Sequence, residues 1–193
     1  MKGVFVFLAD GFEEIEALAT VDILKRGGVD VMTVSHDMEG FVTGAHGITV
    51  CPDMTMDHFM AELRPSGTEA TDVLVFPGGL PGAQNLADND LLIQVMNRHW
   101  EDGGTVAAIC AAPGLVASKL PDLDGLRFTC YTGFEAAPQA KGGTYTGAPV
   151  EVSGRLITGR GPGCAIPFAL AVLARIAGEE TAARVRDGLL LPE

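Results

Sequence analysis

The chain has 193 residues, a length that fits one domain, and we expect a single domain over residues 1–193. Its 13 basic and 25 acidic side chains give a formal net charge of −12 at pH 7. This balance argues against a nucleic-acid or anionic-membrane partner, because affinity for both depends on Lys and Arg. With 47% apolar and 20% charged residues, the composition also excludes a disordered chain.

The N-terminal apolar run, residues 4–9, is shorter than a signal-peptide core of about 7–15 residues and is followed by acids. No stretch approaches the ~20 apolar residues of a membrane span, so we expect a cytoplasmic protein. In that compartment the cysteines are expected to be free thiols. The scattered histidines match no zinc motif, and we expect neither a metal nor a cofactor.

The predicted elements alternate between strand and helix from the N-terminus. A strand over residues 3–9 is followed by a helix from about Glu13 to Arg26, which ends at two glycines. Residues 29–35 form the next strand. Residues 41–50, interrupted by two glycines, predict a small hairpin appended to the main sheet.

The same alternation continues in the second half. Strands are predicted over residues 73–76, 105–109 and 156–158. Helices are predicted near 89–101, from 112–113 onward, and over about 165–177. Strands that alternate with helices pair in parallel through right-handed crossovers, so we expect an α/β three-layer sandwich.

Short loops, most of them rich in glycine, follow four of these strands. They contain Asp10-Gly11, Pro77-Gly78-Gly79, Cys110, and residues 159–163. Loops that leave the carboxyl ends of parallel strands meet at one edge of the sheet, where ligands bind. We therefore expect one cleft into which backbone amides can point, because glycine permits close approach.

Cys110 stands at a strand-to-helix turn, the position at which hydrolases present a nucleophile. A helix N-terminus there would lower the pKa of the thiol and favour the reactive thiolate. The alternative is a small buried hydrophobic residue, the interpretation favoured for Cys51, Cys130 and Cys164.

Three acids begin the first helix. For Glu13 and Glu14 a role in complementing the helix dipole is a sufficient explanation. Glu16 lies one step deeper and could turn toward the cleft, where a carboxyl beside a thiol would titrate together with it. Spacing alone does not choose between Glu16 and Glu14.

The segment 159–163 fails as a dinucleotide fingerprint, because Cys164 occupies the place of the third glycine. Two interpretations stay open. One is an anion-binding turn with Arg160 as its charge, and the other is a helix-entry loop with a surface arginine.

Four ordered motifs resemble the ThiJ/PfpI superfamily, and within it the DJ-1-like branch of the parkinsonism-associated protein and of bacterial members often labelled thiazole monophosphate biosynthesis proteins. They are GFEEIEA at 11–17, FPGG at 76–79, AICAAP at 108–113 and TGRGPG at 158–163. The resemblance runs nearly end to end. It implies a flavodoxin-like fold with a mainly parallel sheet, similar to class I glutamine amidotransferases, and a homodimer.

The resemblance also implies roles for single residues. Cys110 matches the family's nucleophile and oxidation-sensitive cysteine, and Glu16 matches the carboxylic acid hydrogen-bonded to it. Gly79 and Ala111 match the residues whose amides form an oxyanion-hole-like pocket. Arg160 matches an arginine near that pocket.

The chain departs from family patterns at three positions. His46 stands where the human relative has a pocket arginine, and we include it among the anion-binding residues. Tyr131 stands where that relative has a pocket histidine. Ala111 replaces the histidine that follows the cysteine in protease-like relatives, so no local Cys-His pair is available.

Together these features predict a cofactor-independent glyoxalase and deglycase acting on methylglyoxal, glyoxal and their early adducts on protein side chains or nucleotides. The alternative is a cysteine-based sensor of oxidative stress or a redox-regulated chaperone. A peptidase or amidase is disfavoured by the missing histidine.

Overall fold

A seven-stranded sheet forms the centre of the computed structural model, which describes residues 2–37, 40–62 and 67–191. Its strand order is β10-β11-β7-β6-β1-β2-β5. The strands are β1 Val4–Leu8, β2 Val31–Ser35, β5 Met54–Thr55, β6 Val73–Phe76, β7 Thr105–Ile109, β10 Val150–Ser153 and β11 Leu156–Gly159. All neighbours pair in parallel except β10 and β11, so the predicted mainly parallel sheet is confirmed with one antiparallel edge strand that was not predicted.

The strand order reverses between β1 and β6. After β1 the chain goes to β2 on one side, and it then crosses to β6, β7 and β11 on the other. This is the flavodoxin-like order, in which ligands bind beyond the carboxyl ends of the strands at the reversal point. A ligand-binding site is therefore expected at the loops that follow β1 and β6.

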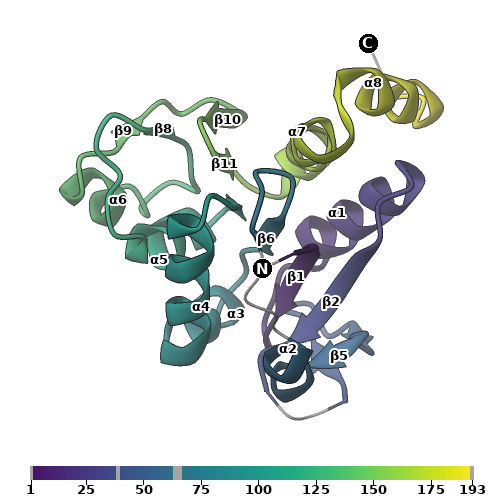
Figure 1. Cartoon of the computed structure of the whole chain (residues 1–193), viewed down its shortest axis with the longest axis horizontal. Helices are drawn as coiled ribbons and strands as arrows, with labels where there is room; N and C mark the ends of the chain where they lie inside the picture. The colour runs from purple at the N-terminus through teal and green to yellow at the C-terminus, as the bar shows by residue number, and fades with distance from the viewer. Residues whose placement is uncertain (1, 38–39, 63–66, 192–193) are drawn as a thin grey trace.

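Helices cover both faces of the sheet (Figure 1). They are α1 Glu14–Arg26, α2 Met56–Glu62, α3 Gly82–Ala87, α4 Asp90–Glu101, α5 Ala112–Leu115, α6 Ala136–Ala140, α7 Ala165–Ala177 and α8 Glu179–Gly188, with 3-10 turns η1 Ala117–Lys119 and η2 Pro162–Cys164. Helices α1 and α7 lie on one face, and α2 to α5 lie on the other. The predicted three-layer sandwich is confirmed.

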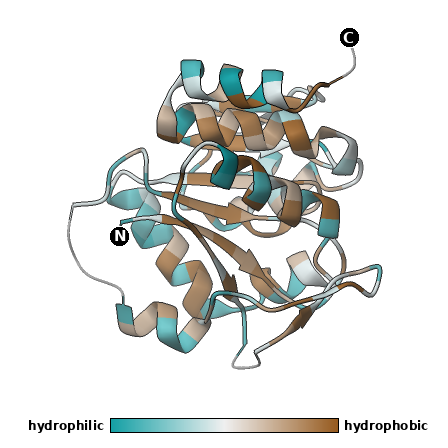
Figure 2. Cartoon of the chain, turned by 90° about the vertical axis from the view of Figure 1, so that its right-hand side faces the viewer, coloured by the Kyte–Doolittle hydropathy of each residue, from teal (hydrophilic) through white to brown (hydrophobic). Residues whose placement is uncertain are grey.

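The core is divided by the sheet into two halves. Figure 2 shows that the strands at the centre of the molecule are hydrophobic. On one side Phe7 stacks on Phe76 with ring centroids 5.4 Å apart, and on the other Leu24 and Phe168 are fully buried. Strands covered on both faces carry continuous apolar runs, which is why they could be recognised in the sequence.

Smaller elements surround this sheet. The predicted hairpin forms from β3 Val42–Thr43 and β4 Thr49–Val50, as a separate two-stranded sheet rather than an extension of the main one. A parallel pair of β8 Arg127–Phe128 and β9 Thr144–Tyr145 was not predicted. Among the described helices, none is both long and apolar enough to cross a membrane.

Candidate functional site

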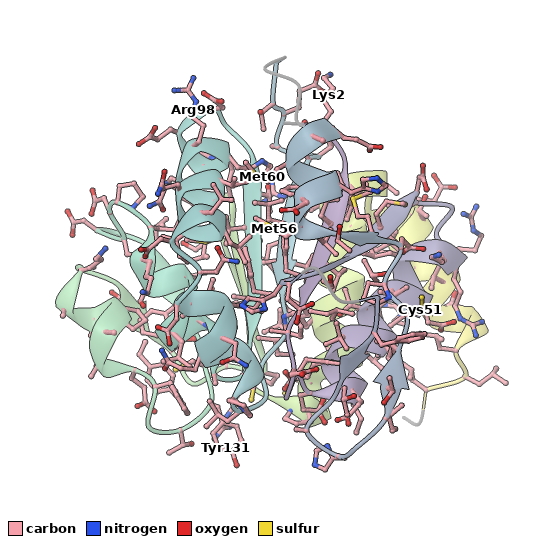
Figure 3. The ribbon with its side chains drawn as sticks, turned by 90° about the horizontal axis from the view of Figure 1, so that it is seen from below. Lys2, Cys51, Met56, Met60, Arg98 and Tyr131 are labelled. Atoms are coloured by element: carbon pink, nitrogen blue, oxygen red, sulfur yellow. The ribbon has the colours of Figure 1, made fainter. Side chains whose placement is uncertain are left out.

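The loops that follow the parallel strands meet at one edge of the sheet, as expected. The backbone N–H of Cys110 donates to the carbonyl of Gly159 at 2.9 Å, and that of Glu13 donates to the carbonyl of Gly78 at 3.0 Å. Tyr131 joins them, because its N–H donates to the carbonyl of Cys110 at 2.8 Å. In Figure 3 Tyr131 lies at the opposite end of the molecule from Lys2.

Cys110 sits on a strained turn directly after β7. Its φ of 65° falls in the left-handed region, which non-glycine residues occupy at a cost of order 1–3 kcal/mol. The side chain is only 8% exposed. Strain of this kind persists only where surrounding bonds impose it, and here the hydrogen bonds of Cys110 to Gly159 and Tyr131 do so.

Glu16 turns into the same site from the first turn of α1. It is fully buried, and its Oε2 accepts a hydrogen bond from the N–H of Gly78 at 2.8 Å. Its Oε1 is buried and has no hydrogen-bond partner among the described residues. The sequence left Glu16 and Glu14 as alternatives, and the structure selects Glu16.

Gly78 leaves the space in which the thiol and the carboxyl meet. A Cβ at this position would lie 2.6 Å from Cys110 Cβ, 2.8 Å from Glu16 Oε2 and 3.0 Å from Cys110 Sγ. Any side chain there would therefore push the two groups apart. The glycine is required for packing at this position and not for an unusual φ.

The carboxyl of Glu16 is held close to neutrality. Burial raises its pKa to about 7, with a further increase from the charge of Glu13, while hydrogen bonds from Gly78 and Cys110 lower it. The ionised form lacks the hydration it would have in water, and one amide only partly replaces it. Near neutral pH Glu16 can therefore both accept and donate a proton.

The pKa of the Cys110 thiol is shifted in the direction opposite to the one expected from the sequence. Burial raises its pKa to about 12, assisted by the charge and the hydrogen bond of Glu16, although hydrogen bonds from the amides of Gly79 and Ala111 lower it. The predicted lowering by a helix N-terminus is thus wrong in net sign. Helix α5 is a single turn, Ala112–Leu115, and its few amides do not outweigh burial beside a carboxylate.

The raised pKa values imply that Cys110 and Glu16 titrate together, and we call them the shared-proton pair. Burial raises the pKa of the thiol further than that of the carboxyl, so the thiol keeps its proton where Glu16 is already ionised. Moving that proton from sulfur to the carboxylate generates a thiolate in place, where the amides of Gly79 and Ala111 favour the charged form. This arrangement suits nucleophilic addition followed by proton transfer.

The other two acids of this turn do more than complement the helix dipole. Glu13 caps α1, since its Oε2 accepts from the N–H of Glu16 at 2.8 Å. Glu14 is buried and binds His46 of the β3–β4 hairpin through its two oxygens, with N···O distances of 2.7 Å to both the backbone N and Nδ1. The expectation that both acids serve only the dipole is therefore wrong.

His46 and Arg160 are the other residues expected to bind an anion near Cys110. The ring of His46 hydrogen-bonds to Glu14, and this contact does not support an anion-binding role beside Cys110. Arg160 is exposed and directly follows Gly159, next to the site. Cys130 is buried as predicted, whereas Cys51 is exposed because it follows the short strand β4 at the surface.

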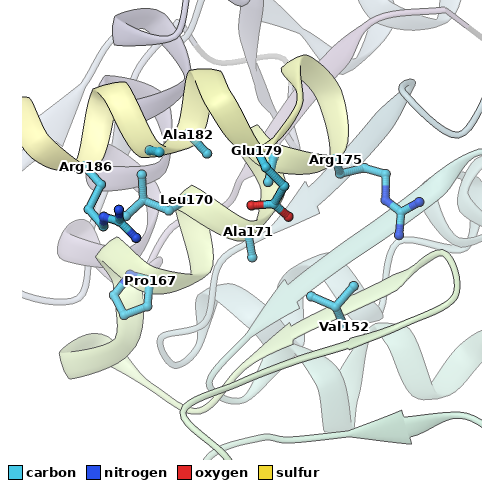
Figure 4. A pocket seen from close by; sticks show the side chains of 10 residues that line it. Val152, Pro167, Leu170, Ala171, Arg175, Glu179, Ala182 and Arg186 are labelled. Carbon is cyan, nitrogen blue, oxygen red and sulfur yellow. The ribbon is translucent and has the colours of Figure 1, made fainter.

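A separate pocket of about 660 Å³ lies between β10, α7 and α8 (Figure 4). Its floor is apolar and includes Leu170 and Ala171, and Arg175, Glu179 and Arg186 line it with charge. All of its lining residues come from these three elements rather than from the loops around Cys110. The pocket is thus separate from the shared-proton pair.

Comparison with known proteins agrees with this fold. The DJ-1/PfpI family model matches residues 2–175. Protein DJ-1 homolog A of Arabidopsis thaliana is 34% identical over 98% of this chain, which spans about half, 47%, of that relative's length. The glutathione-independent glyoxalase DJR-1.2 of Caenorhabditis elegans is 31% identical, over 87% of this chain and 84% of the relative. A crystal structure of a DJ-1 superfamily protein from Salmonella typhimurium superposes with a TM-score of 0.87 at 35% identity, covering all of both chains.

Proposed function

Because the chain belongs to the DJ-1/PfpI family, we propose that it converts small reactive aldehydes to hydroxy acids without an added cofactor. The observation that carries the proposal is that Cys110 Sγ and Glu16 Oε2 meet over Gly78, in a buried place where the pKa of both groups is raised. The family includes a protein named as a glutathione-independent glyoxalase, which supports this class of reaction.

With methylglyoxal, the first step forms a bond between Cys110 Sγ and the aldehyde carbon. As sulfur attacks, its proton passes to the Glu16 carboxylate, and the carbonyl oxygen becomes an alkoxide. In this proposal the amides of Gly79 and Ala111, whose hydrogen bonds lower the pKa of Cys110, hold this oxygen. The alkoxide then takes this proton from Glu16, which gives a neutral hemithioacetal and returns Glu16 to the carboxylate form.

Glu16 then moves a proton between neighbouring carbons. It removes the proton from the former aldehyde carbon and returns one to the former ketone carbon, through an enediol. The first carbon is oxidised to a thioester while the second is reduced to an alcohol, so no external oxidant is needed. Water cleaves the C–S bond and releases lactate, which restores the thiol.

The same addition can act on methylglyoxal that is released from early adducts on protein side chains or nucleotides. Deglycation would then follow from removal of the free aldehyde. We propose it as a consequence of the glyoxalase reaction and not as a separate site.

The test is conversion of methylglyoxal to lactate in the absence of glutathione. We expect Cys110→Ala to lose turnover, because no other group at the site can form the C–S bond. Cys51→Ala is the matched control, since Cys51 is an exposed free cysteine and should react with aldehyde without turning it over. Wild-type turnover by Cys110→Ala would overturn the proposal.

A redox-sensing role and the homodimer stay predictions. The thiolate is the form that peroxide oxidises, and the raised pKa of Cys110 keeps that form scarce near neutral pH. A sensor requires Cys110 to gain two oxygens before the exposed Cys51 reacts, which intact-mass measurement under graded peroxide reports. Sedimentation velocity measures the oligomeric state.

A further inference from the structure

A second group of chemically active side chains lies where the hairpin meets α1. Among the residues that the structure describes, Glu13, Glu14 and His46 are the one set of three metal-ligating side chains whose ligand atoms all lie within 4.8 Å of one another. Two come from the N-terminus of α1 and the third from the hairpin turn. None takes part in the aldehyde chemistry proposed above.

Backbone hydrogen bonds hold the hairpin against the start of α1. The N–H of Ala45 donates to the carbonyl of Phe12 at 2.8 Å, and the N–H of Gly11 donates to that of Thr43 at 2.8 Å. The N–H of His46 donates to Glu14 at 2.7 Å. These bonds place the imidazole next to the carboxylates without any ion present.

The carboxylates are unusually enclosed for acidic residues. Glu13 and Glu14 are 7% and 4% exposed. Oε2 of Glu13 accepts a hydrogen bond from the N–H of Glu16 at 2.8 Å. Two carboxylates that are enclosed side by side lose hydration and repel each other, and a bound cation would offset both costs.

We infer that Glu13, Glu14 and His46 bind a divalent cation of the zinc class, through one oxygen from each glutamate and one imidazole nitrogen. The cation displaces the proton of the His46–Glu14 hydrogen bond, which goes to solvent. Two carboxylates then balance the two positive charges.

The donor set selects among metals. Calcium takes six to eight oxygen ligands, and magnesium prefers oxygen in octahedral geometry, whereas zinc accepts mixed nitrogen and oxygen ligands. Tetrahedral zinc with bonds of about 2.0–2.2 Å has ligand atoms roughly 3.4 Å apart, so the present cluster must contract slightly. The His46 side chain is 71% exposed, which lets it move and gives a cation access.

Three protein ligands leave the fourth position of a tetrahedral ion open to water.

The test is titration of Zn²⁺ at pH 7.5 in a Cys110→Ala background, which removes the thiol as a competing ligand and makes the result independent of catalysis. We expect one Zn²⁺ per chain, with affinity unaffected by calcium or magnesium. Adding His46→Asn should weaken binding about tenfold or more, and adding Glu13→Gln should do the same, while its amide oxygen can still cap α1.

His58→Asn is the matched control, since His58 is an exposed histidine outside the cluster. Crystals soaked in Zn²⁺ should give an anomalous peak between Glu13, Glu14 and His46. Equal binding by the His46→Asn and His58→Asn proteins, a peak elsewhere, or no binding by the Cys110→Ala protein would each overturn the inference.

Discussion

Replacing Glu16 by glutamine should stabilise the protein as pH rises, even though it removes a group proposed to be catalytic. Glutamine keeps the shape of the side chain and an oxygen that can accept from Gly78. It removes only the charge that burial disfavours.

The magnitude follows from the pKa of Glu16, which burial raises from the ordinary value of 4.5 to about 7. Within that interval the folded protein binds more protons than the unfolded chain, so the wild-type protein loses stability as pH rises. Each pH unit corresponds to about 1.4 kcal/mol, giving about 3 kcal/mol in total. The advantage of Glu16→Gln should grow from pH 4.5 to about pH 7 and then stay constant.

The assay is urea unfolding of both proteins at equal concentration over this pH range. Trp100 is the single tryptophan and a natural fluorescence reporter, packed under Arg155 with the guanidinium carbon 4.2 Å from its ring centroid. The difference between the two free energies of unfolding cancels the titration of all groups that they share.

Glu14→Gln is a control of opposite sign. Burial raises the pKa of Glu14, but hydrogen bonds from His46 and Ile48 outweigh it, so the net pKa is lowered. Its charge therefore stabilises the fold above the ordinary carboxyl pKa, and that contribution is lost as pH falls. A pH-independent difference for Glu16→Gln, or the same sign for both variants, would refute the electrostatic reasoning.

Two further predictions concern the same site. The kcat/KM for methylglyoxal should rise with pH and level off above about pH 7, because Glu16 must be ionised to accept the thiol proton; a flat pH–rate profile would contradict this role. Gly78→Ala should lower turnover and cost about 1–3 kcal/mol of stability by separating Cys110 from Glu16, whereas Gly163→Ala, whose Cβ meets nothing within 4 Å, should match the wild type in both assays.

The sequence predicted the central parallel strands and the edge of the sheet at which their loops meet. Strands β1, β6 and β7 are buried on both faces and therefore appear as short apolar runs, with loops that had to leave on one edge because the strands are parallel. Cys110 stood out for this reason. Elements with weak periodicity, such as the short helices α2 and α6 and strand β8, depend on tertiary packing and were not predicted.

Hydrophobic patterns and strand direction could not predict the separate roles of Glu13, Glu14 and Glu16. Residues two apart on a helix point in different directions, so Glu16 reaches Gly78 while Glu14 reaches the hairpin, and spacing alone does not reveal which one faces the thiol. His46 is 32 residues from Glu14 and follows no motif spacing; only the docking of the hairpin brings them together.

Chain order was thus sufficient to predict the parallel centre of the sheet, the edge at which its loops meet and the position of Cys110 on that edge, since these depend on local hydrophobic patterns and strand direction. The protonation of Cys110 and Glu16 depends on how deeply the fold buries them and on which groups it brings beside them. Burial and proximity of distant segments are properties of the packed molecule, and they reversed the expected pKa shift of Cys110.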